Sequence, residues 1–69
     1  MFIEQAIQNK EDFIRHWVEE MNTNTKLLRD APTSMRLIRR MKNIAKTLEE
    51  EVEKLNKLYR MRDAGEEYV

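Results

Sequence analysis

The sequence predicts an all-α protein, an antiparallel two-helix hairpin that dimerises into a four-helix bundle. Each half of the chain carries apolar residues at helical spacing, and the turn-forming residues are almost confined to the stretch between the halves. A charged fraction of 38%, with one glycine and one proline, is typical of long helices with solvated faces. At 69 residues the chain has room for a single domain.

The first helix is expected over residues 2–30. Its apolar side chains occupy an arc of about 160°, which is wider than one neighbouring helix covers. We interpret the surplus as a dimer interface made by Phe2, Phe13, Trp17 and Met21. For Trp17 the simpler interpretation is a core position, and an anchor for a different protein is the alternative. The segment 22–25 contains poor helix formers, so a kink there is left open.

A turn is expected at residues 31–33, because Pro32 disfavours helix at Ala31 and because Thr33 or Ser34 can cap the next helix. The second helix is expected over residues 34–64, with a clean apolar arc of about 120°. Gly65 suits the position just past a helix end. Residues 65–69 are expected to be a frayed tail.

Folding back at Pro32 brings together positions whose numbers sum to about 64. The charges at these positions have opposite signs, so the order of charges along the sequence favours a hairpin. Lys10 lies near the centre of the first apolar arc, so we expect Glu51 to pair with it and fix the register. Uninterrupted helices in an antiparallel dimer, with Pro32 as a kink, are the alternative. The predicted pairs are Glu4 with Lys57 and Arg60, Lys10 with Glu51 and Glu53, Arg15 with Glu49 and Glu50, and Glu19 and Glu20 with Lys42 and Lys46.

Several function classes are disfavoured. Without cysteine the chain has no disulfide or thiolate metal site, and His16 has no second histidine to help it hold a metal. No nucleophile, base and oxyanion arrangement is evident, so we expect no enzymatic activity, no catalytic residue and no cofactor. The N-terminus lacks the pattern of a signal peptide and no apolar stretch reaches membrane-spanning length, so a cytoplasmic location is expected.

The turn end of the hairpin is locally basic. Only Asp30 offsets its five basic residues, which are Lys26, Arg29, Arg36, Arg39 and Arg40. Arginine presents fixed forks of donors to carboxylates and phosphates, so these residues are the candidate partner-binding site. The alternative is a solvated face that pairs with acids on another subunit.

The resulting hypothesis is a homodimeric helical hairpin that acts as a non-enzymatic protein-protein interaction module. It would serve as an adaptor, inhibitor or assembly factor, of the kind that bacteria and their viruses encode on short genes, with an acidic protein as partner. The alternative is an RNA- or DNA-binding helical bundle that uses the basic turn end against phosphates. A balanced total of 13 basic and 13 acidic residues disfavours a surface built wholly for nucleic acid.

The expected architecture is similar in shape to the small plasmid copy-control proteins, which dimerise helical hairpins and bind paired RNA loops. A second resemblance is to the start of the second helix of the two-helix ribosomal protein near the exit tunnel. That family is strongly basic, unlike this chain, and prefers an apolar-small pair where Lys42 and Asn43 stand. The residues that carry the second resemblance are Pro32, Met35, Arg36, Ile38, Arg39, Arg40 and Thr47.

Overall fold

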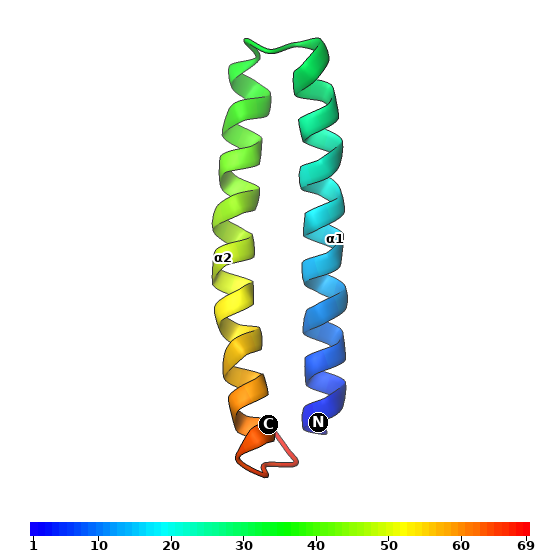
Figure 1. Cartoon of the computed structure of the whole chain (residues 1–69), viewed down its shortest axis with the longest axis vertical. Helices are drawn as coiled ribbons and strands as arrows, with labels where there is room; N and C mark the ends of the chain where they lie inside the picture. Colours follow the sequence, from blue (N-terminus) through cyan, green and yellow to red (C-terminus); the bar gives the residue numbers. More distant parts are fainter.

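The computed structural model describes residues 1–69 and confirms the predicted all-α hairpin. Helix α1 (Ile3–Asp30) and helix α2 (Met35–Asp63) run antiparallel, with the turn at one end and both termini at the other (Figure 1). The molecule is a rod of 49 × 15 × 15 Å. Neither helix combines the length and the apolar character needed to span a membrane.

The turn is stabilised by local hydrogen bonds. The backbone N–H of Ser34 donates to the carbonyl of Ala31 at 3.0 Å. The Ser34 hydroxyl accepts from the backbone N–H of Leu37 at 3.3 Å, so Ser34, and not Thr33, caps α2. Because α1 ends at Asp30, with Ala31 as its C-cap just before Pro32, this short segment sets where the chain reverses.

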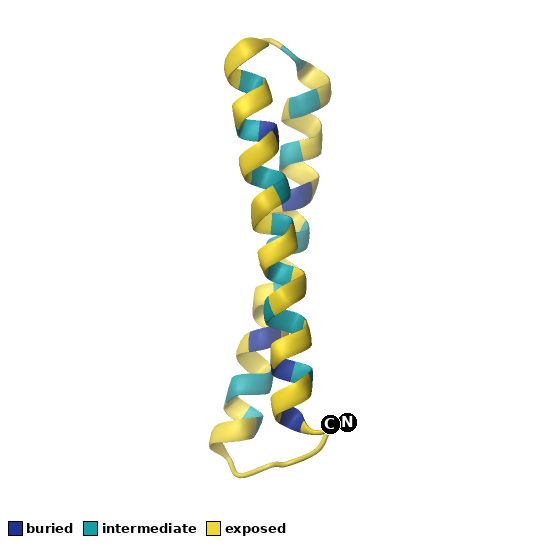
Figure 2. Cartoon of the chain, turned by 90° about the vertical axis from the view of Figure 1, so that its right-hand side faces the viewer, coloured by how far each residue is buried: buried dark blue, intermediate teal, exposed yellow.

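The seam between the helices hides few side chains (Figure 2). Only five of the 69 residues are buried, and three of them, Ile3, Ile7 and Leu55, form one cluster toward the termini. Ile44 and Asn24 are buried closer to the turn. Two helices cover only one stripe of each other, so much of the apolar surface stays accessible to solvent.

One ion pair crosses the seam where the sequence predicts it. Lys10 Nζ lies 2.6 Å from Glu51 Oε2, and Lys54 lies 3.2 Å from the other oxygen of the same carboxylate. The side chain of Glu51 is only 12% exposed. The hydrogen bond from Lys10 lowers the pKa of Glu51 below its usual range, and burial only partly opposes this shift.

The other predicted cross-helix pairs are wrong in detail. Glu20 lies 3.5 Å from Arg40 instead of meeting Lys42 or Lys46. Glu4 reaches Arg62 at 3.8 Å, beyond Lys57 and Arg60. Arg15 pairs within α1, with Asp12 at 2.8 Å. Long exposed side chains reach about one helical turn in either direction. The order of charges along the chain therefore predicts the antiparallel orientation of the helices, but it does not predict which two residues pair.

The segment 22–25 does not interrupt α1. Three of its polar side chains form hydrogen bonds within the helix. Thr23, Asn24 and Thr25 each donate to the backbone carbonyl four residues earlier, at 2.7–3.1 Å. The kink that the composition left open is therefore absent, and α1 runs unbroken to the turn.

The prediction of a frayed tail is wrong, because the tail pairs with the start of α1. Gly65, at φ +86°, ends α2 in a Schellman motif in which the N–H of Glu66 donates to the carbonyl of Met61 at 3.1 Å. The chain then turns back, and the carbonyl of Glu67 accepts from the N–H of Ile3 at 2.7 Å. Phe2, which has no capping side chain, stacks on Tyr68 with ring centroids 4.9 Å apart.

We expect Ser34→Ala to lower the free energy of unfolding by about 1 kcal/mol, because the N–H of Leu37 loses its acceptor. Urea denaturation followed by circular dichroism measures this change. Thr33→Ala is the matched control, since Thr33 is exposed, and it should change stability by less than about half as much. Equal losses in both variants would contradict the assigned cap.

Glu51→Gln should destabilise the hairpin by about 1 kcal/mol at neutral pH, through loss of the bond to Lys10. The lowered pKa of Glu51 means that its contribution is present above the ordinary glutamate pKa of about 4.3 and is lost as pH falls through the folded value. Urea titrations at a series of pH values should therefore show the two proteins converging in acid. Glu50→Gln, at an exposed position, is the control and should stay close to the parent throughout.

Candidate functional site

Charge is strongly segregated along the rod. Residues 21–48, which surround the turn, contain seven basic and one acidic side chain, whereas the rest of the chain contains six basic and twelve acidic ones. The neutral total therefore conceals a basic half and an acidic half. An anionic partner is attracted to the turn end and repelled by the end that holds the termini.

Three arginines of α2 gather beside one another near the turn. Arg36, Arg39, Arg40 and Asn43 line a shallow hollow of about 410 Å³ that has no apolar lining residue. All four residues are exposed. Spacings of three and four residues place these side chains on one face of the helix, which is why the sequence brings them together.

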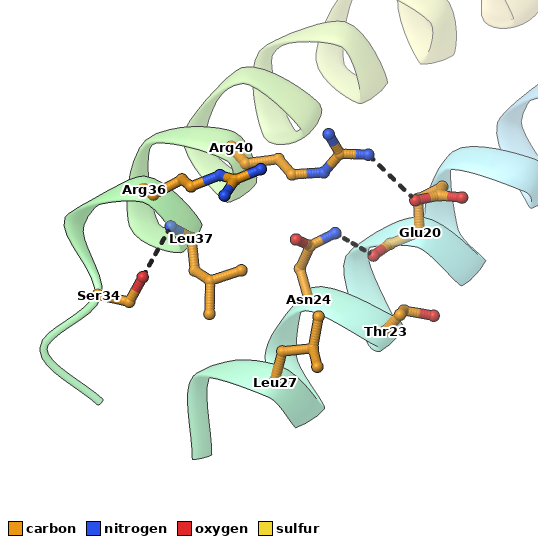
Figure 3. A pocket seen from close by; sticks show the side chains of 8 residues that line it. All are labelled: Glu20, Thr23, Asn24, Leu27, Ser34, Arg36, Leu37 and Arg40. Carbon is orange, nitrogen blue, oxygen red and sulfur yellow. Dashed lines mark hydrogen bonds and ion pairs between the residues drawn. The ribbon is translucent and has the colours of Figure 1, made fainter. Parts of the chain in front are cut away.

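A second cleft, of about 470 Å³, adjoins this hollow and lies between the two helices (Figure 3). Arg36 and Arg40 extend from α2 at its edge, and Arg40 reaches Glu20 on α1. Buried Asn24 lies on the α1 side and donates its amide N–H to the carbonyl of Glu20 at 2.7 Å. The cleft thus combines two guanidinium groups and the Glu20 carboxylate with neutral polar side chains and two leucines.

Arg36 and Arg39 have no acidic partner, since none of the ion pairs of the chain includes them. They also stand in the first two turns of α2, which contain no acidic residue, and the helix dipole disfavours cations there. A bound carboxylate or phosphate would relieve both conditions.

The remaining two predicted basic residues do not join this cluster. Lys26 and Arg29 are exposed on α1 and line neither the arginine hollow nor the adjoining cleft. The sequence shows that all five basic residues lie near the turn, but not which side of the hairpin each one faces.

The predicted dimer residues occupy different environments. Phe2 contacts the tail, and Phe13 is 44% exposed with its ring edge-on to Trp17 at 6.1 Å. Trp17 and Met21 are half-buried in the seam. The indole N–H of Trp17 is buried without a hydrogen-bond partner, although a buried tryptophan usually pairs this group.

No group of three or more histidine, cysteine or carboxylate side chains converges on a metal-sized site.

Besides Glu51, one group has a shifted pKa. The Tyr59 hydroxyl donates to the Glu11 carboxylate at 2.7 Å, and this hydrogen bond raises the pKa of the phenol. Both shifted groups belong to pairs that join α1 to α2. Packing of the two helices against each other accounts for both pKa shifts.

Asn24 and Asn43 also line the candidate site, and their only signal in the sequence is helical spacing from the arginines and the seam. A comparison of the chain with protein families, curated proteins and solved structures finds no significant match.

Proposed function

We propose that the chain is a non-enzymatic protein-protein interaction module, a homodimeric helical hairpin that recognises an acidic protein surface with its turn end. The observation that carries the proposal is the group of adjacent guanidiniums in which Arg36 and Arg39 lack any acidic partner. Such forks of donors bind carboxylates with defined geometry, so they provide specificity as well as attraction.

The apolar surface supports self-association in this proposal. Four apolar residues and one asparagine are buried, while ten large apolar side chains stay exposed. A chain of this length gains limited stabilisation from one helix pair, and a second copy would bury part of the surface that remains. The module would then act as an adaptor, inhibitor or assembly factor that presents two basic turn ends.

Nucleic acid is the second candidate, because phosphates satisfy the same guanidiniums. Two observations favour a protein instead. The acidic half of the rod repels an extended polyanion, and none of the five aromatic residues lies between positions 18 and 58, where bases would need a stacking surface near the arginines.

The double variant Arg36→Gln/Arg39→Gln tests the site. The probe is a fluorescent helical peptide rich in glutamate and leucine, and anisotropy measures its affinity. We expect binding to weaken about tenfold or more, because two charge-assisted contacts are lost. Lys57→Gln/Arg60→Gln removes the same charge from exposed positions in the acidic half and should alter affinity by less than about twofold.

An RNA hairpin titrated at about 50 and 200 mM salt separates the two classes of partner. Tighter binding of the RNA than of the peptide, with a steep loss at high salt, would establish the nucleic-acid function. Equal peptide binding by the parent and the Arg36→Gln/Arg39→Gln variant would show that the arginine hollow is not the recognition site.

A further inference from the structure

One apolar stripe of α2 is left largely uncovered by α1, and only its last residue, Tyr59, packs against the cluster of Ile3, Ile7 and Leu55. Ile38, Ala45, Val52 and Tyr59 recur every seven residues, so they follow one line along the helix with a slow drift. Ile38 is 39% exposed and Val52 40%, Ala45 is exposed, and Tyr59 is half-buried against Glu11. The stripe therefore runs along the edge of the seam and faces outward over most of its length.

The stripe is self-complementary when two copies run antiparallel. A two-fold axis between residues 48 and 49, at the centre of α2, places Ile38 opposite Tyr59 of a second copy and Ala45 opposite Val52. Each large side chain then meets an apolar neighbour, and the small Ala45 allows the helices to approach closely. In the parallel arrangement each residue would meet its own copy, so Ala45 would meet Ala45 and leave a gap.

Charges beside the stripe follow the same symmetry. Lys42, Lys46, Glu49 and Glu53 lie along the outer flank of the stripe at helical spacing, all four are exposed, and none takes part in an ion pair. Within one chain the flank carries two pairs of like charges four residues apart, which repel mildly, and one opposite pair, Lys46 and Glu49, three residues apart. The two-fold axis instead places Lys42 near Glu53 of the second copy and Lys46 near its Glu49.

The charge of the whole rod favours the same orientation. An antiparallel neighbour sets the basic half of one copy, net +6, beside the acidic half of the other, net −6. A parallel neighbour would juxtapose halves of like sign, which is unfavourable.

We infer that a second copy of this chain docks along the stripe Ile38, Ala45, Val52 and Tyr59, antiparallel, with Lys42 and Lys46 paired to Glu53 and Glu49 across the two-fold axis. The inference rests on the proposed homodimer and specifies its contact surface, the orientation of the two copies and the ion pairs between them. It moves the interface from the aromatic residues of α1 to α2. The arginines at positions 36 and 40 extend toward the cleft with Asn24, away from this surface.

Reversing single charges tests the ion pairs between the two copies. Lys46→Glu places like charges opposite each other at two points of the dimer, and Glu49→Lys does the same with the opposite sign. Each variant alone should self-associate about tenfold more weakly or worse in sedimentation equilibrium. An equimolar mixture should form a one-to-one heterodimer, in which every such pair is attractive again. Lys26→Glu is the control at an exposed position on α1, outside the flank, and should dimerise like the parent.

Apolar substitution tests the face. Val52→Asp should produce a folded monomer, because the change lies at the exposed edge of α2. Phe13→Asp, at a residue of similar exposure on α1, should leave the dimer intact. Dissociation by Phe13→Asp but not by Val52→Asp would overturn the inference and favour the aromatic face of α1. Circular dichroism verifies that both variants remain helical.

Cysteine cross-linking tests the orientation, with no background because the chain contains no cysteine. A mixture of Ala45→Cys and Val52→Cys proteins should oxidise mainly to the mixed disulfide. Preferential formation of the two homodisulfides would show parallel docking and overturn the inference. A parent protein that is monomeric yet binds the acidic peptide would overturn the dimer while leaving recognition by the arginines in place.

Discussion

The narrow seam between two antiparallel helices is the constraint on which this structure depends. Across the seam, Lys10 and Glu51 form a partly buried ion pair that fixes how α1 and α2 align along their length. The apolar residues Ile3, Ile7 and Leu55 pack on one side of this pair along the rod, toward the termini. Toward the turn the packing is thinner, and polar Asn24 lies where a larger apolar residue would fill the space.

The proposed interaction surfaces follow from this constraint. Two helices bury one stripe of each other and leave the neighbouring stripes to solvent, so apolar residues at the seam edge are available to another protein. The division of charge along the rod then distinguishes the two ends. One molecule thereby carries an exposed apolar side along the rod and a basic end at the turn.

Most of the fold could be predicted because its signals are local. Pro32 and Ser34 mark the turn through steric exclusion and capping, and Gly65 marks the end of α2 through its positive φ. The pairing of Lys10 with Glu51 was also accessible, because a lysine in the middle of an apolar arc requires a nearby acid. These features depend on residue type and on spacing within one or two turns.

The features that escaped prediction depend on contacts between distant backbone groups or on the side of a helix. The hydrogen bond from the N–H of Ile3 to the carbonyl of Glu67 joins two backbone groups. Residue type gives no indication of such a bond, so it could not be predicted from the sequence. For the candidate site, the sequence located Arg36, Arg39 and Arg40 near the turn. It did not separate them from Lys26 and Arg29, because that requires the rotation of α1 about its own axis.

The closure of the two chain ends has a mechanical consequence. The N–H of Val69 donates to the carbonyl of Met1 at 3.2 Å, so a pulling force between the ends acts first on this contact and on the stacked rings of Phe2 and Tyr68. The helices would then separate by unzipping, one layer of contacts at a time toward Pro32, and would not slide past each other. A rod loaded in this way yields at low force, whereas the same rod gripped at the turn and at the termini would resist as a spring of intact helices.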